Sequence, residues 1–169
     1  MLYASYGSNL HPMRMSLRLP ESRFQGTAAI KGRSLRFHKR SIDSSGKCNI
    51  TTDDGSIHVA VYELSEEEKT RLDEIEGVGA GYVVEKIDVP GFGECFTYAA
   101  TPSHIDERLR PYTWYKELVL AGCGHLDFPA DYLAMIGNIE AIDDPDQDRH
   151  ASNMRIVEHA RKFTNAAST

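Results

Sequence analysis

The chain opens with Leu2-Tyr3-Ala4-Ser5-Tyr6-Gly7-Ser8-Asn9-Leu10, a short run of strand-favouring residues that is stopped by glycine. Pro12 follows, and proline suits the first position of a helix. The pattern therefore predicts a strand that leads through a glycine turn into a helix. Such a turn leaves several backbone N–H groups without partners, with the positive end of the helix behind them, so it can bind an anion such as a ligand carboxylate. A plain strand-to-helix connection, with Asn9 as a local cap, is the alternative interpretation.

Periodic apolar residues predict a strand-rich first part and a helical second part. Strands are expected within 23–38, with a turn at Gly32, and over 49–52, 57–64, 82–89 and 94–100. Helices are expected over 65–76, 111–122, 129–138 and 146–163. The tetrapeptide Asp53-Asp54-Gly55-Ser56 favours a hairpin, because Asp-Gly suits tight hairpin turns. This order favours one α+β domain over residues 1–169, and we expect its last few residues to be disordered.

The best-defined helix in the sequence begins at Ser65. Ser65 and Glu68 have the capping-box spacing, so each side chain can accept a hydrogen bond from the other's free amide, and Gly77 suits the left-handed position after a helix. Glu76 then lies at the carboxyl end, where free carbonyl groups and Asp73 on the same face disfavour a negative charge on its side chain. A carboxyl group in such a place suits proton transfer near neutral pH, so Glu76 is a candidate acid/base. An exposed acidic helix end is the alternative interpretation.

Composition and charge exclude several classes of function. The 169 residues are 41% hydrophobic and 26% charged, which suits a globular domain with a real core. The formal net charge of -6, without a compensating run of basic residues, argues against nucleic-acid binding. No apolar run approaches the roughly 18 residues of a membrane span. The N-terminus also lacks the basic and apolar regions of a signal peptide.

The cysteines and histidines predict neither disulfides nor a metal site. Cys48, Cys95 and Cys123 are far apart and form no Cys-x-x-Cys pair, so we expect free thiols in the reducing cytoplasm. The seven histidines include no closely spaced pair suited to a shared metal ion. The aspartates of segment 144–148 imitate a calcium loop, but arginine stands where the loop needs glycine. We interpret that segment as a capped helix start.

Two motifs are specific as a pair: Tyr6-Gly7-Ser8-Asn9-Leu10 directly after the first strand, and Glu76-Gly77-Val78 before the strand Gly81-Tyr82-Val83-Val84. Together they resemble the γ-glutamylcyclotransferase family, the AIG2-like group. The resemblance extends to Pro111-Tyr112-Thr113-Trp114-Tyr115-Lys116 and covers roughly residues 2–160 in the right order.

The resemblance implies an α+β fold, a small mixed β-barrel with helices packed around it and a helical C-terminal part, and neither metal nor cofactor. It implies that Glu76 is the catalytic acid/base. The substrate-binding residues that it implies are Tyr6, Gly7, Ser8, Asn9 and Leu10, whose backbone amides hold the γ-glutamyl group, together with Tyr82 and Tyr115. The region between residues 38 and 50 has no distinctive match, so the leaving-group side of the site is undefined.

The implied reaction is attack of the substrate α-amine on its own γ-carbonyl, which releases 5-oxoproline and a free amine. Asn9 resembles the branch that acts on γ-glutamyl amino acids or on γ-glutamyl tails of biosynthetic intermediates. The implied partner is a small-molecule γ-glutamyl substrate, with no nucleic acid or membrane, and pairing into a homodimer stays open. A non-catalytic binder of γ-glutamyl compounds and a γ-glutamyl amidase that releases glutamate are the alternative functions.

Overall fold

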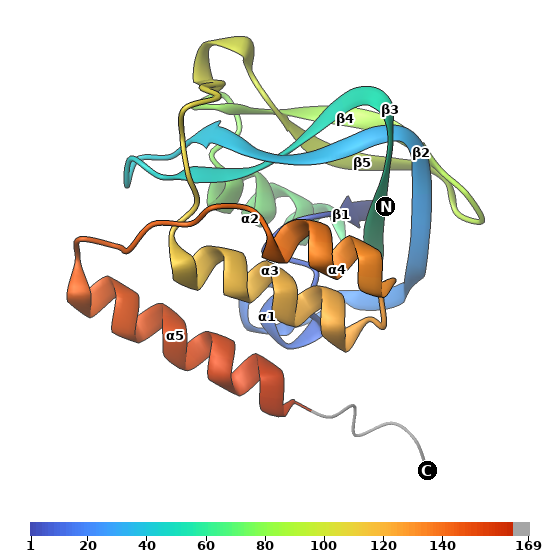
Figure 1. Ribbon diagram of the computed structural model, residues 1–169. Coiled ribbons are helices and arrows are strands. Elements are labelled where there is room, and N and C mark those ends of the chain that lie inside the picture. The colour runs from blue at the N-terminus through green and yellow to red at the C-terminus, as the bar shows by residue number, and fades with distance from the viewer. Residues whose placement is uncertain (164–169) are drawn as a thin grey trace.

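A five-stranded sheet with helices beside it forms the structure, a computed structural model that describes residues 1–163 (Figure 1). The strands are β1 (Leu2–Ser5), β2 (Arg23–Arg40), β3 (Gly46–Glu63), β4 (Tyr82–Val89) and β5 (Gly93–Ala100). The α-helices are α1 (Pro12–Arg18), α2 (Glu66–Glu76), α3 (Thr113–His125), α4 (Ala130–Gly137) and α5 (Gln147–Lys162), with a short 3-10 helix over Pro102–His104. The predicted α+β class is confirmed. The prediction of disorder in the last few residues lies outside the described residues.

The sheet is mixed and open, with strand order β2-β3-β1-β5-β4. β1 lies at its centre, antiparallel to β3 and parallel to β5, and β4 pairs with β5 in an antiparallel hairpin. The predicted barrel is wrong, because no backbone ladder joins the edge strands β2 and β4 among the described residues. The two 18-residue strands β2 and β3 pair with each other along their length, which leaves β2 at an edge. An ion pair connects the edges instead, from Arg33 Nη2 to Glu85 Oε1 at 2.8 Å.

The two turns predicted at Gly32 and at Asp53–Ser56 form one bulge in a continuous ladder. β2 runs unbroken through Gly32, which has a φ of +77° and faces residues 53–55 of β3 where the register shifts. The Asp53 carboxylate accepts a hydrogen bond from the Gly55 N–H at 2.8 Å. The Asp-Gly sequence thus closes a local turn inside a strand, and the predicted hairpin at this place is wrong.

The reversal between β2 and β3 lies at residues 41–45. Ser44 has a φ of +68°, and its N–H donates to Ser41 O at 3.0 Å. The Asp43 carboxylate holds the turn by accepting hydrogen bonds from the N–H and the hydroxyl of Ser45. Serines and aspartate that bond the nearby backbone are typical of turns, although no Gly or Pro marks this one.

Helix α2 begins and ends as predicted. The Glu68 N–H donates to Ser65 Oγ at 3.1 Å, and the Ser65 N–H donates to Glu68 Oε2 at 3.2 Å. Gly77 follows the last helical residue with a φ of +70°, the left-handed conformation that glycine adopts at low cost. Glu76 is therefore the last residue of the helix, and the chain turns away directly after it.

The C-terminal helices form a layer on one side of the sheet, where α3 packs against both α4 and α5 (Figure 1). The buried Trp114 of α3 donates from Nε1 to Asp144 Oδ2 at 2.8 Å, and Asp146 caps α5 by accepting from the Arg149 N–H at 2.9 Å. The predicted capped helix start is thus confirmed. Among residues 1–163, the structure has no helix of the length and apolar character that a membrane crossing requires.

Candidate active site

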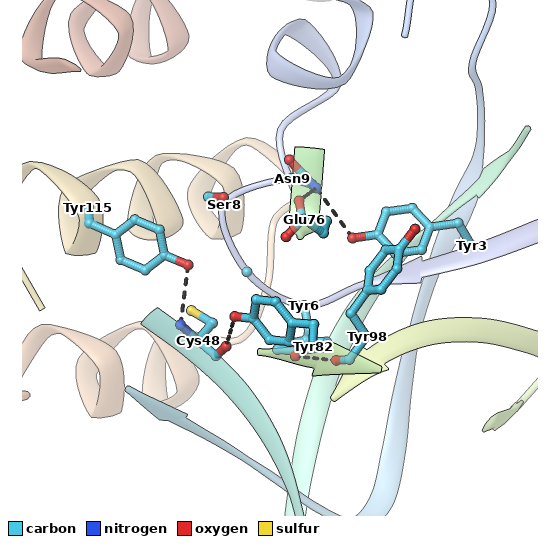
Figure 2. A pocket seen from close by; sticks show the side chains of 10 residues that line it. Tyr3, Tyr6, Ser8, Asn9, Cys48, Glu76, Tyr82, Tyr98 and Tyr115 are labelled. Atoms are coloured by element: carbon cyan, nitrogen blue, oxygen red, sulfur yellow. Dashed lines mark hydrogen bonds between the residues drawn. The ribbon is translucent and has the colours of Figure 1, made fainter. Parts of the chain in front are cut away.

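The loop after β1 and the carboxyl end of α2 meet at one pocket, although 67 positions separate Asn9 from Glu76 in the sequence. The residues that line it are Tyr3, Tyr6, Gly7, Ser8, Asn9, Cys48, Glu76, Tyr82, Tyr98 and Tyr115 (Figure 2). Its empty volume is about 290 Å³ including the open mouth. Much of this volume is open to solvent, so the enclosed part is small and suits a small acyl group.

Asn9 connects the two motifs through its side-chain amide. Nδ2 donates to Glu76 Oε1 at 2.9 Å and lies 3.3 Å from the Tyr3 hydroxyl oxygen, to which it also donates. Asn9 is itself 3% exposed, so the surrounding chain fixes its orientation. Among the described residues, Glu76 Oε2 has no hydrogen-bond partner, which leaves one carboxylate oxygen available to a ligand in the pocket.

Arg18, the last residue of α1, completes the support of Glu76. Arg18 Nη1 donates to Asn9 Oδ1 at 2.9 Å and to Glu76 Oε1 at 3.1 Å. One cation and one amide therefore hold the same carboxylate oxygen and fix the orientation of the Glu76 side chain. The sequence analysis missed Arg18, since nothing in the spacing of residues 9, 18 and 76 shows that they meet.

The carboxylate of Asp73 is engaged by two other side chains. It accepts from Lys69 Nζ at 2.5 Å and from the Tyr98 hydroxyl at 2.7 Å. The like-charge effect expected from the helix spacing is thus offset by Lys69. The charge nearest to Glu76 is the guanidinium of Arg18.

Tyrosine rings form most of the pocket wall (Figure 2). The Tyr6 hydroxyl donates to Tyr98 O, and the Tyr82 hydroxyl donates to Cys48 O, each at 2.5 Å. The Tyr115 hydroxyl accepts from the Cys48 N–H at 3.2 Å. Burial raises the pKa values of Tyr6, Tyr82 and Tyr115 far above the usual range, so these phenols stay neutral and position the backbone.

The loop of Gly7, Ser8 and Asn9 presents backbone amides. In the described part of the chain, the N–H groups of these three residues have no acceptor. The Leu10 N–H differs, because it donates to Gly7 O at 3.1 Å and closes the turn. The loop lies close to β3: a Cβ added to Gly7 would lie 3.0 Å from Cys48 Cβ. Glycine suits this close approach, because a larger residue would press the loop against β3.

Six of the seven predicted substrate-binding residues line the pocket, and so does the predicted acid/base Glu76. Leu10 does not line it: its side chain is fully buried, where Gly122 of α3 packs against it. The Leu10 carbonyl accepts from the Tyr62 hydroxyl at 2.6 Å, so Leu10 anchors the loop in the core. The roles of the pocket residues in binding and catalysis stay predictions.

Sequence reasoning missed three residues of the wall: Tyr3, Cys48 and Tyr98. Tyr3 is a buried residue of β1, three positions before the Tyr6 that was predicted. Cys48 and Tyr98 come from β3 and β5, whose register was not predicted. Burial raises the pKa of the Cys48 thiol to about 12, so this sulfur is protonated at neutral pH and is no nucleophile.

A second guanidinium, that of Arg14, lies near the guanidinium of Arg18. Arg14 precedes Arg18 by one helical turn of α1. Burial, reinforced by the charge of Arg18, lowers the pKa of Arg14 to about 10, while Tyr115 and Glu76 oppose the effect. Its buried Nε has no hydrogen-bond partner among the described residues. Positive charge thus exceeds negative charge where α1 meets the pocket.

No cluster of three or more His, Cys, Asp or Glu that could hold a metal ion occurs within residues 1–163.

Comparisons with known proteins identify a family. The sequence profile described as "Gamma-glutamyl cyclotransferase, AIG2-like" matches residues 3–117, a range that contains every residue lining the pocket. A search of curated protein sequences gave no significant match.

Several solved structures share the fold. A protein named gamma-glutamyl cyclotransferase is 25% identical, with a TM-score of 0.80 over 94% of this chain and 98% of its own. An uncharacterized protein from Homo sapiens is 26% identical, with a TM-score of 0.78 over 93% of this chain and 97% of its own. YkqA from Bacillus subtilis shares the fold at 18% identity, with a TM-score of 0.71 over 84% of this chain and 56% of its own.

Proposed function

The chain belongs to the γ-glutamyl cyclotransferase, AIG2-like family, and on that premise we propose that it cyclises γ-glutamyl amides to 5-oxoproline. The released product is a free amine, and γ-glutamyl amino acids are the proposed substrates. One observation carries the proposal: within residues 1–163, the Glu76 carboxylate has one oxygen without a partner, and it lies in the same pocket as the amides of Gly7, Ser8 and Asn9, which also have no partner there. We place the activity in the cytoplasm, since all three cysteines are buried free thiols.

The substrate itself supplies the nucleophile, so the enzyme has to fold it and move protons. The α-amine attacks the γ-carbonyl, the new C–N bond closes a five-membered lactam, and the original amide C–N bond breaks. Holding the chain in the reactive shape can contribute on the order of 7–11 kcal/mol to the lowering of the barrier. No serine or thiol nucleophile is needed, in keeping with the protonated state of Cys48.

Glu76 is the proposed proton carrier. Its free Oε2 accepts a proton from the attacking ammonium and returns one to the leaving nitrogen. Of the three ammonium protons, one stays on the lactam nitrogen and two end on the released amine, so no proton is lost or gained overall. Asn9 and Arg18 hold Oε1, which fixes the direction of Oε2 during both transfers.

The loop amides are proposed to bind negative charge. The N–H groups of Gly7, Ser8 and Asn9 can hold the α-carboxylate of the γ-glutamyl group, and the excess positive charge of Arg14 and Arg18 favours an anion there. An amide that also reaches the developing oxyanion would contribute about 2.7–4 kcal/mol.

Product analysis with a matched pair of variants tests the proposal. Purified protein is incubated with γ-glutamyl amino acids, glutathione and γ-glutamyl-ε-lysine, and 5-oxoproline and glutamate are quantified. We expect 5-oxoproline, and Glu76→Gln should lower kcat by at least about 100-fold with an unchanged melting temperature, because proton transfer by a positioned side chain contributes that much. Glu74→Gln, on the exposed face of α2, is the control and should keep full activity.

Three outcomes would contradict the proposal. Glutamate as the product would make the protein an amidase. Binding of γ-glutamyl compounds without turnover would make it a binder. Undiminished 5-oxoproline production by Glu76→Gln would remove Glu76 from the mechanism.

A further inference from the structure

Lys39 of β2 is a buried cation without an anionic partner. The residue is 9% exposed, and no carboxylate among residues 1–163 lies within ion-pair distance of its Nζ. The Lys39 ammonium packs over an aromatic ring instead, with Nζ 4.4 Å from the ring centroid of Tyr82. The ammonium is only partly removed from water and has no hydrogen-bond or ion-pair partner among the described residues, so it is available to a ligand of opposite charge.

The carboxylates nearest to Lys39 are already engaged. Asp43 accepts from Lys47 Nζ at 2.7 Å and from Ser45, and Lys47 is the residue directly opposite Lys39 in the β2–β3 ladder. Glu76 is held by Arg18 and Asn9. Burial lowers the pKa of Lys39, while the charges of Glu76 and Asp43 oppose that effect, which places the ammonium within electrostatic reach of the pocket.

The contacts of Lys39 place it at the edge of the pocket wall. A Cβ added to Gly81 would lie 3.0 Å from Lys39 Cε and 3.1 Å from its Nζ, so the ammonium packs against the backbone just before Tyr82. Tyr82 lines the pocket and donates to Cys48 O, and both residues lie across the hollow from Asn9 (Figure 2). Lys39 is therefore next to the Tyr82 side of the pocket, across from Asn9.

Under the proposed function, the leaving group extends toward this side. If the γ-glutamyl end binds the loop amides and the scissile nitrogen lies at Glu76, the remainder of the substrate extends away from the loop. In a γ-glutamyl amino acid, a carboxylate follows the scissile nitrogen by only two bonds, through the α-carbon. Its negative charge then approaches the unpaired ammonium.

We propose that Lys39 is a specificity-determining residue that binds the carboxylate of the leaving amino acid. The inference rests on the proposed function and adds the substrate class: leaving groups with a carboxylate next to the scissile nitrogen are preferred over neutral amines. The segment 38–50, for which the sequence offers no family match, then supplies the recognition of the leaving group.

Two substrates that differ in one charge test the proposal: γ-glutamyl-alanine and γ-glutamyl-alaninamide. The wild-type protein should prefer the acid. Lys39→Met, which keeps an unbranched apolar side chain and removes the ammonium, should lower kcat/KM for the acid by about 10- to 100-fold, mainly through KM, and leave kcat/KM for the amide unaffected. Lys39→Arg should retain much of the preference. Lys31→Met, on an exposed part of the same strand, is the control.

The experiment distinguishes a failure of the proposed role of Lys39 from a failure of the proposed cyclisation. Turnover of the neutral amide reports cyclisation without the carboxylate, so it tests the proposed function alone. Calorimetric binding of both compounds to wild type and Lys39→Met gives the acid-to-amide ratio even without turnover. An unchanged ratio, an equal loss on both compounds, or no binding of either would overturn the role of Lys39.

Discussion

Replacing Gly7 with alanine places a methyl group against β3. On the present backbone its Cβ would lie 3.0 Å from Cys48 Cβ, 3.3 Å from Cys48 Sγ and 3.7 Å from the Tyr115 hydroxyl oxygen. Favourable contacts between carbon atoms are about 3.5–4.0 Å, so the loop and the strand must separate by roughly half an ångström. Cys48 is held by hydrogen bonds from Tyr82 and to Tyr115, so the loop is the part expected to move.

The size of the effect follows from these contacts. Extra methyl groups in a well-packed core cost about 1–3 kcal/mol, so the free energy of unfolding should fall by that amount. A displaced loop also misaligns its amides. Loss of one hydrogen bond to a charged ligand group costs about 1.5–3 kcal/mol, which weakens the affinity for a γ-glutamyl compound by about 10- to 150-fold.

Urea unfolding and calorimetry measure the two effects separately. Affinity for γ-glutamyl-alanine is measured in the Glu76→Gln background, where no turnover is expected. Gly124→Ala is the control, because a Cβ on this helical glycine of α3 meets no atom within 4 Å. It should stabilise the protein by up to about 1 kcal/mol and leave binding unchanged. A Gly7→Ala variant that loses stability but binds normally would show that the loop is only structural, and this would refute the amide cradle.

Two further predictions concern buried titratable groups. Burial and then His125 lower the pKa of His11 to about 4, and the neutral ring caps α1 by accepting from the Met13 N–H. The unfolded state therefore takes up the proton first, so the free energy of unfolding should fall by about 2–3 kcal/mol between pH 6.5 and 4. His11→Asn, which keeps a capping acceptor, should lose this part of the pH dependence in urea titrations, and an unchanged slope would contradict the assignment. The pKa of the Cys48 thiol is raised to about 12, so iodoacetamide at pH 8 should not alkylate Cys48 in the native protein and should alkylate it fully in urea. Mass spectrometry measures the extent of alkylation. Rapid alkylation of Cys48 in the native protein would contradict its burial.

Sequence predicts the elements that local interactions determine. The start of α2 follows from Ser65 and Glu68, and its end follows from Gly77, because all the bonds involved lie within a few residues. The loop of Gly7 and the position of Glu76 at a helix end were predictable for the same reason. A resemblance to a family then joined these two places into one site.

The pairing of strands that are distant in the chain could not be predicted from the sequence. The Asp-Gly signal at Asp53 is a true local turn, yet the ladder between β2 and β3 absorbs it as a bulge. The barrel failed likewise, since its closure depends on the pairing of two edge strands far apart in the chain. The roles of Arg18 and Lys39 could not be predicted either, because each is an ordinary basic residue in the sequence. The fold shows that Arg18 pairs with Glu76 and that Lys39 has no ion-pair partner among the described residues.

The charged groups around the site complement those of the proposed substrate. They are the ammonium of Lys39 beside Tyr82, the carboxylate of Glu76 bonded to Asn9, and the loop amides together with Arg14 and Arg18. A γ-glutamyl amino acid carries a carboxylate on its leaving group, then an ammonium, then the α-carboxylate. Under both proposals, each charge of the substrate meets its opposite, with the reacting ammonium at Glu76. A neutral amine as leaving group would satisfy only two of these three contacts and would leave Lys39 buried and unpaired. The ammonium of Lys39 therefore distinguishes acidic from neutral leaving groups. The chemistry of cyclisation by itself does not make this distinction.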